Sequence, residues 1–217
     1  QAVHLAQIDR DKQLAPKKII TPASVENALR ILLAVGGSTN AIIHLTAIAG
    51  RLGIPIPLQQ LNKLSDETPV LIDLKPTGDH YMEDLFKAGG LGVVLRELKP
   101  LLNLECLSVT GETLNERLQS EPAYVNREVV RSFDQPIQKM GGLVSLFGSL
   151  APGGAILKRS AADPTLFESE GKAVVFNSLE DLLKRSAQLL FLFLIVDLTF
   201  ESMGYPNGII PISEYDR

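Results

Sequence analysis

The sequence has little of the chemistry on which many metalloproteins and secreted proteins depend. Among its 217 residues there is one cysteine, Cys106, and no tryptophan. One cysteine cannot close an internal disulfide, and it cannot hold an iron–sulfur cluster or a structural zinc ion by itself. The sequence also contains no Walker loop, GxGxxG, HExxH, GxSxG or CxxC motif. No single local motif therefore identifies a reaction.

The chain also lacks a basic excess and a long apolar run. It has 21 basic and 25 acidic residues, a formal net charge of −4, whereas nucleic-acid binders carry a basic excess or stripe. Its longest uncharged apolar run, residues 189–196, has eight residues, and a membrane span needs about 18. The first residues show no basic segment followed by an apolar one. We therefore expect no nucleic-acid or membrane partner, and a cytoplasmic location or, in a eukaryote, a mitochondrial or plastid matrix.

The apolar content is sufficient for a real core, since 45% of the residues are apolar and 21% are charged. A length of 217 residues corresponds to one large domain or two small ones. Continuous or alternating apolar runs predict strands over residues 69–74 and 104–110, and we expect these two strands to be neighbours in one sheet. Helical spacing with start and stop signals predicts helices over residues 22–35, 39–52, 58–64, 81–88, 93–97 and 112–119. This alternation indicates an α/β fold class for the first part.

The character of the sequence changes near residue 138. Short β-type runs at 143–150, 155–158 and 173–176 follow, with a predicted helix over 178–188. The Gly153-Gly154 pair makes a hairpin between the first two runs plausible. We therefore expect two domains, residues 1–138 and residues 139–217, the second of them β-rich.

The string GGSTNA, which begins at Gly36, is the most suggestive local feature. Gly37 and its neighbour permit positive φ angles or the close approach of a ligand. Ser38, Thr39 and Asn40 then lie at a predicted helix N-terminus, where free N–H groups favour an anion. The competing interpretation is a helix–turn–helix corner with ordinary capping, and the sequence leaves both open.

A second group of polar residues follows the predicted strand 69–74. Asp73 and Lys75 lie at its end, where ligands gather in α/β folds, although a surface ion pair explains them equally well. His44 and His80 are the histidines nearest to these motifs. His44 is more typical of a structural histidine than of a catalytic base, and His80, at a predicted helix start, could bind a carboxylate or simply cap the helix. For Cys106, inside a predicted strand, an inert thiol is the ordinary expectation.

Four long strings occur in a fixed order along the chain. They are GGSTNAIIHLTAIAGRLGI (36–54), PVLIDLKPTGDHYMEDLFKAGGL (69–91), LSVTGETL (107–114) and GSLAPGGAILKRSAADP (148–164). Together they resemble the dihydroxy-acid dehydratase / phosphogluconate dehydratase family, in particular its dihydroxy-acid and pentonate dehydratase branch. The resemblance covers about residues 15–188, and the sequence diverges after 188. It implies the C-terminal part of the family's α/β domain, followed by the start of a barrel-like β domain.

The resemblance implies a lyase that removes water from a 2,3-dihydroxy acid to give a 2-keto acid, with an iron–sulfur cluster and Mg²⁺ as cofactors. The family's cluster cysteines, its Mg²⁺ ligands and its serine base have no counterparts here, so we assign no catalytic or metal-binding residue to this chain. Gly37, Ser38, Thr39 and Asn40 remain as candidates for a place near the substrate. Valine at Gly37 in a complete enzyme should then reduce turnover more than stability, and an equal loss of both would favour packing.

Two hypotheses follow from the resemblance. In the first, the chain is an internal fragment of a dehydratase for branched-chain amino acid biosynthesis or sugar-acid metabolism. Its substrate is 2,3-dihydroxy-isovalerate or a sugar acid such as arabinonate or xylonate. In the second, it is a non-catalytic derivative that acts as a binding or assembly module. Because residues 189–200 are almost all apolar, we expect a homo-oligomer that buries them, or else an exposed, aggregation-prone segment.

Overall fold

The structure is a computed structural model that describes residues 14–120, 124–149, 151–163, 165 and 176–185. These residues form a mostly helical, mixed structure with one small two-stranded antiparallel sheet. The α-helices are α2 (Pro16–Ile19), α3 (Pro22–Ala34), α4 (Thr39–Gly50), α5 (Leu58–Glu67), α6 (Met82–Lys87), α7 (Gly90–Glu97), α8 (Leu114–Ser120) and α9 (Leu179–Arg185). Two 3₁₀ turns, η1 (Lys99–Leu101) and η2 (Arg159–Ala161), and two strands, β1 (Leu143–Leu146) and β2 (Ala155–Lys158), complete the elements.

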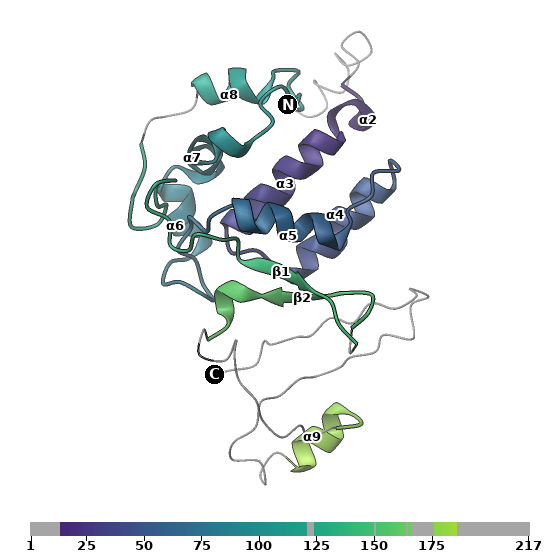
Figure 1. The fold of residues 1–217 in the computed structure, drawn as a ribbon. Helices are drawn as coiled ribbons and strands as arrows, with labels where there is room; N and C mark the ends of the chain where they lie inside the picture. Colours follow the sequence, from purple (N-terminus) through teal and green to yellow (C-terminus); the bar gives the residue numbers. More distant parts are fainter. Residues whose placement is uncertain (1–13, 121–123, 150, 164, 166–175, 186–217) are drawn as a thin grey trace. The chain divides into compact units, whose positions relative to one another are not determined.

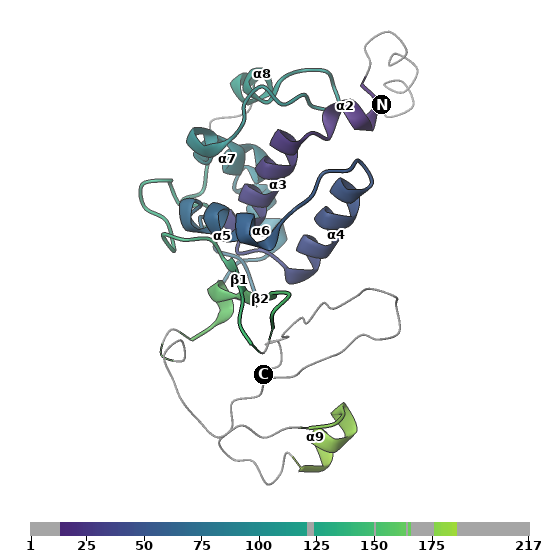
Figure 2. The same ribbon diagram turned by 45° about the vertical axis from the view of Figure 1, so that its right-hand side comes forward.

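The central helix α3 begins and ends where the sequence predicts. Thr21 is the N-cap and Pro22 occupies the first helical position, where a missing N–H costs nothing. A capping box closes this end, because the Ser24 N–H donates to Thr21 Oγ1 at 3.2 Å and the Thr21 N–H donates to Ser24 Oγ at 2.8 Å. The helix stops before Gly36. In Figures 1 and 2, α3 lies between α7 on one side and α4 on the other.

The main core lies between the end of α3, the extended residues 71–74, and helices α6 and α7. Twelve buried residues form it, and all of them are aliphatic: Ala34, Leu71, Ile72, Leu74, Leu85, Ala88, Val93, Val94, Leu98, Leu102, Val129 and Val130. Burying aliphatic side chains is the dominant stabilising term in folding. The core therefore joins segments from residue 34 to residue 130 and holds the loops between them in place.

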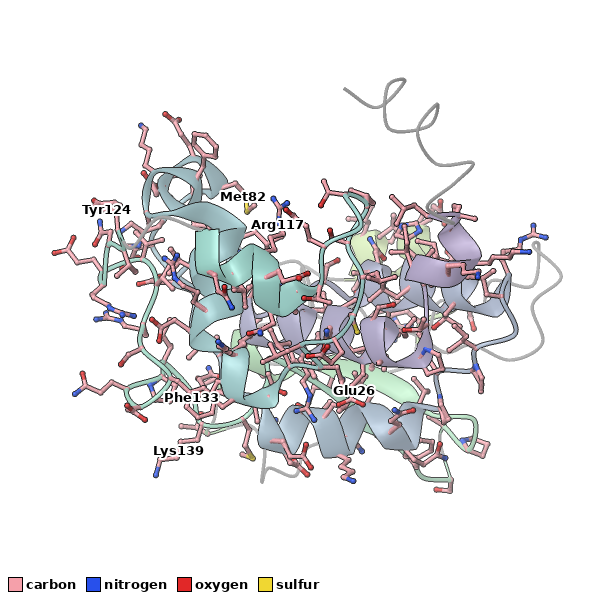
Figure 3. All side chains as sticks on the ribbon, turned by 90° about the horizontal axis from the view of Figure 1, so that it is seen from above. Glu26, Met82, Arg117, Tyr124, Phe133 and Lys139 are labelled. Carbon is pink, nitrogen blue, oxygen red and sulfur yellow. The ribbon has the colours of Figure 1, made fainter. Side chains whose placement is uncertain are left out.

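One buried charge lies beside this core. The side chain of Arg30 on α3 is 8% exposed and donates to Glu26 at 3.1 Å, Glu67 at 2.8 Å and Thr68 at 3.2 Å. In Figure 3, which views the protein from above, Glu26 is labelled near the middle of the picture, whereas Lys139 and Tyr124 are labelled at its edge. Because a buried guanidinium without partners would be very costly, this network fixes α3 against α5.

The run at residues 69–74 is extended and buried, as predicted, but its expected pairing with residues 104–110 is wrong. Isolated bridges join Val70 to Gln138 and Ile72 to Val130 instead. The Arg131 N–H donates to the Leu71 carbonyl at 2.8 Å. The partner of residues 69–74 is thus a later segment of the chain that forms no regular strand. The periodicity of apolar residues does not identify such a partner.

Residues 104–110 fold back on the residues that follow them. Leu107 pairs with Thr113, and the Ser108 N–H donates to the Glu112 carbonyl at 2.8 Å around Gly111. The alternation that predicted a sheet strand therefore belongs to a local turn. Leu107 and Val109 are exposed, whereas Leu104, which packs on the main core, and Cys106 are half-buried.

The expected hairpin after residue 138 is present as β1 and β2. In the part of the chain that the structure describes, these two short strands are the only sheet, so the expected start of a barrel is not seen there. Most of the predicted strand at 173–176 lies outside the described residues. The apolar residues 189–200 lie outside them entirely. Helix α9 lies within the predicted helix 178–188.

The chain divides into two compact units. The first comprises residues 1–144 with 158–161, and the second comprises residues 145–157 with 162–217. The dividing line runs through the hairpin, and the expected boundary near residue 138 stays a prediction. Among the described residues, no helix has the length and apolar content to span a membrane.

Candidate functional site

The corner between α3 and α4 is built on two glycines in the left-handed region. Gly36 has φ +79° and Gly37 has φ +57°, which non-glycine residues rarely adopt. Ser38 returns to extended backbone, and α4 starts at Thr39. This turn reverses the chain and lays α4 beside α3.

The backbone of a distant segment packs directly on the first glycine. The Ser160 hydroxyl donates to the Gly36 carbonyl at 3.1 Å, and the Ser160 N–H donates to the Gly142 carbonyl at 3.1 Å. A Cβ added to Gly142 would lie 2.6 Å from Gly36 Cα. These two backbones therefore approach as closely as glycine alone permits.

Gly37 has no space for a side chain either. A Cβ there would lie 2.8 Å from the Leu32 carbonyl oxygen and 2.9 Å from Leu143 Cδ1. Gly36 is thus explained by its positive φ, since a Cβ there would make only ordinary contacts, whereas Gly37 is explained by its positive φ and by close packing within the protein. This environment favours the packing interpretation for Gly37, while its effect on turnover stays a prediction.

The polar residues after the glycines face outward. Ser38 and Asn40 are exposed and Thr39 is half-buried. Ser38 is the N-cap of α4, but its hydroxyl makes no capping hydrogen bond. The Ala41 N–H donates to the Ser38 carbonyl at 3.0 Å. The N–H groups of Thr39 and Asn40, the first two of α4, have no acceptor inside the helix, so this end presents backbone donors beside hydroxyl groups. His44 is also exposed, one turn further along.

Asp73 and Lys75 do not form the ion pair that the sequence suggested. The Asp79 N–H donates to Asp73 Oδ1 at 2.7 Å, and Asp73 Oδ2 lies 3.7 Å from His80 Nδ1. That nitrogen is buried and has no hydrogen-bond partner within the described structure. Lys75 Nζ instead donates to the Tyr81 hydroxyl at 2.6 Å and lies 4.1 Å from the centre of its ring. The hydrogen bond from Asp79 to Asp73 thus closes the loop, and Lys75 covers an aromatic ring.

Sequence reasoning missed two hydroxyl residues that border the corner. A Cβ on Gly36 would lie 3.6 Å from Ser160 Oγ and 3.7 Å from Thr77 Oγ1. Neighbouring Arg159 donates to the Gly141 carbonyl and to Ser65 Oγ, both at 3.0 Å, and so fastens residues 159–161 to α5. Thr77 and Ser160 lie within the strings 69–91 and 148–164 described above. That was the only signal for these two residues in the sequence.

Cys106 fits the expectation of an unreactive thiol. It is half-buried, and burial raises the pKa of its thiol, although a hydrogen bond with Thr21 opposes the shift. A raised pKa leaves less of the reactive thiolate near neutral pH.

The donor set of this chain does not fit an iron–sulfur cluster. Clusters are held by several thiolates, and the whole sequence offers one. Among the described residues, no group of three or more histidine, cysteine, aspartate or glutamate side chains is placed to hold a metal ion. We therefore assign no metal-dependent step to these residues.

Comparison with known proteins gives the context for this corner. Residues 1–117 match the family described as dihydroxy-acid/6-phosphogluconate dehydratase N-terminal, and residues 128–189 match its C-terminal counterpart. The chain belongs to the dihydroxy-acid/6-phosphogluconate dehydratase family. The corner, α4 and the loop 73–81 all lie in the stretch that matches the N-terminal part of this dehydratase family.

Individual relatives agree with this assignment. The chain is 46% identical over 170 residues to an L-arabonate dehydratase from Azospirillum brasilense, a match that covers 77% of the chain and 29% of the relative. It is 42% identical over 173 residues to a dihydroxy-acid dehydratase from Caldanaerobacter subterraneus, and 44% identical over 173 residues to one from Caldicellulosiruptor bescii. Each of these two matches covers 79% of the chain and 31% of the relative. The chain therefore spans about a third of the length of the curated dehydratases it matches.

Proposed function

We propose that this chain is part of a dehydratase that converts a 2,3-dihydroxy acid into a 2-keto acid. The observation that supports this best is the consecutive match to both parts of one dehydratase family within a single chain, at residues 1–117 and 128–189. In the net reaction, a proton leaves C2 and hydroxide leaves C3, together forming water. The resulting enol then becomes the ketone. The chemistry therefore needs a base and stabilisation of the departing hydroxide.

The contribution of this chain is to bind and orient the acid. Its best candidates are Ser38, Thr39 and Asn40, since they combine exposed polar side chains with the N-terminal end of the twelve-residue helix α4. Such an end favours a carboxylate through free N–H groups and the helix dipole. Gly37 belongs to the same candidate corner and holds its shape by close packing. The base and the cofactor ligands would come from parts of the enzyme that this chain does not contain.

Two substrate classes remain in the proposal, and the relatives support both. One is a sugar acid such as arabinonate or xylonate, because a similar protein carries the name L-arabonate dehydratase. The other is 2,3-dihydroxy-isovalerate, the expectation drawn from the resemblance to dihydroxy-acid dehydratases. A sugar acid requires a pocket rich in hydrogen-bonding groups, whereas the branched acid requires an apolar one.

The test is a graft into a complete relative. The matching stretch of the A. brasilense L-arabonate dehydratase is replaced by the corresponding residues of this chain, and keto-acid formation is measured from L-arabonate and from 2,3-dihydroxy-isovalerate. We expect the graft to produce keto acid from one of the two. The unaltered relative is the positive control, and the relative without the matching stretch is the negative control.

The graft also tests the alternative, a non-catalytic binding or assembly module. A graft that is folded and carries the relative's normal iron content, yet forms no keto acid from either substrate, would contradict the proposal. The observation that favours the alternative is that a chain with one cysteine cannot hold a metal cluster by itself.

A further inference from the structure

A glycine pair joins the end of α3 to helix α5. The Gly141 N–H donates to the Ser65 carbonyl of α5 at 2.7 Å, and the Gly142 N–H donates to the Leu33 carbonyl of α3 at 3.1 Å. A Cβ on Gly141 would lie 2.9 Å from Ser65 Oγ and 3.0 Å from Leu33 Cβ. The pair therefore fits closely between the two helices.

The 3₁₀ turn η2 binds this glycine pair as well. Arg159 donates to the Gly141 carbonyl and to Ser65 Oγ, both at 3.0 Å. The Ser160 N–H donates to the Gly142 carbonyl at 3.1 Å. The turn η2 belongs to the same compact unit as α3 and α5. Its position in that unit is thus set by the side chain of Arg159 and by the backbone of Ser160.

The Ser160 hydroxyl takes no part in that attachment and binds a different group. It donates to the carbonyl of buried Gly36 at 3.1 Å. This carbonyl belongs to the peptide between Gly36 and Gly37, which have φ +79° and +57°. A peptide between two glycines has more conformations open to it than other peptides, because neither residue carries a Cβ. A hydrogen bond to this carbonyl therefore restricts the backbone at the point where the chain turns into α4.

We infer that Ser160 is a positioning residue for the proposed substrate site. Its hydroxyl holds the peptide between Gly36 and Gly37 in one orientation and, through it, sets how Ser38 and Asn40 are presented at the start of α4. The inference rests on the proposed function, in which these residues orient the substrate carboxylate. Hydrogen bonds weaken steeply when their geometry worsens, so a loosened corner binds the carboxylate less well.

The hydrogen bond from Ser160 to Gly36 also joins the two stretches that match the dehydratase family. Gly36 lies within residues 1–117, and Ser160 lies within residues 128–189. The later stretch thus fixes the geometry of a corner that the earlier stretch builds. This gives the C-terminal stretch a role at the candidate site, although the polar residues of that site all belong to the N-terminal stretch.

The first test is made on the 217-residue chain and needs no activity. In Ser160→Ala, the ¹⁵N order parameters of the Gly37 and Ser38 amides should fall from about 0.85, typical of rigid backbone, towards the roughly 0.6 of flexible backbone. Ser24→Ala is the matched control, because Ser24 is also half-buried and its hydroxyl donates to the Thr21 carbonyl, also at 3.1 Å. Ser24 lies at the opposite end of α3, so its removal should leave the corner unchanged.

The second test measures kinetics in the graft. Ser160→Ala should raise KM about 5–10-fold and change kcat by less than about twofold, because the groups that bind the carboxylate are displaced but not removed. Ser24→Ala should leave KM unchanged. A merely structural role of Ser160 would reduce the amount of folded enzyme, which lowers the apparent kcat and does not raise KM.

Three results would overturn the inference. The first is a Ser160→Ala chain whose order parameters at Gly37 and Ser38 equal those of Ser24→Ala. The second is an active graft in which the two variants have the same KM. The third is a Ser160→Ala chain that does not fold, because Ser160 would then be required for the fold as a whole. An inactive graft beside a Ser160→Ala chain with a loosened corner would reject the proposed function alone, since the order parameters would still show that Ser160 holds the corner.

Discussion

Replacing Gly37 by alanine is expected to lower the free energy of unfolding by about 3 kcal/mol. A side chain at φ +57° costs roughly 1–2 kcal/mol for an L-residue. The added Cβ also meets the Leu32 carbonyl oxygen at 2.8 Å and Leu143 Cδ1 at 2.9 Å, and overpacking of this kind costs about 1–3 kcal/mol. Urea unfolding followed by circular dichroism measures the change.

Gly53→Ala separates the two causes. Gly53 has φ +72°, but a Cβ there would have nothing within 4 Å. Alanine at this position should therefore cost only the backbone strain, about 1 kcal/mol. If the two substitutions destabilise the chain equally, crowding at Gly37 is not what requires glycine. A large loss at Gly37 would also mean that Gly37→Val in a complete enzyme reduces stability together with turnover.

Arg30→Ala should lower the free energy of unfolding by about 2–3 kcal/mol. The Arg30 side chain is 8% exposed and is the shared partner of Glu26 and Glu67. Its removal leaves a buried hydroxyl, Thr68, without its donor and two carboxylates without their counter-charge. The loss is moderated because Glu67 is 41% exposed and can be hydrated.

Lys87→Ala is the matched control for this substitution. Lys87 and Glu83 form an ion pair with the same four-residue spacing as Glu26 and Arg30, but their side chains are 65% and 73% exposed. An exposed pair of this kind contributes about 0.3–0.5 kcal/mol. Equal effects of the two substitutions, in the same urea titration, would contradict the view that burial makes the Arg30 network important.

The sequence predicts best those elements whose signals are local. The Thr21-Pro22 start and the glycine stop of α3 are turn and cap chemistry, and the helix has these ends in the structure. The periodicity of α5 likewise identifies a helix with one apolar side. The partner of residues 69–74 was not predictable in this way, because Val70 and Ile72 pair with irregular residues more than fifty positions later.

The corner at Gly36 could likewise be predicted only in part from local sequence signals. Its glycines and its helix start are predictable as a turn, and both glycines do have positive φ, but the sequence does not show that the distant Leu143 crowds Gly37. Ser160, whose hydroxyl binds the Gly36 carbonyl, lies 124 positions away in the sequence. The local sequence pattern therefore identified the position of the turn. It suggested that a ligand approaches the glycines, whereas in the structure the protein's own backbone and side chains lie against them.

The central claim is that this corner, with its polar residues facing outward, orients a carboxylate substrate. The most direct measurement is kcat/KM for Asn40→Ala in the graft. Gln59→Ala is the control, since Gln59 is an exposed amide at the equivalent second position of α5. We expect Asn40→Ala to lower kcat/KM by about 10–100-fold, the value of a hydrogen bond to a charged group, with an unchanged melting midpoint. Identical kcat/KM values for the two variants would contradict the account.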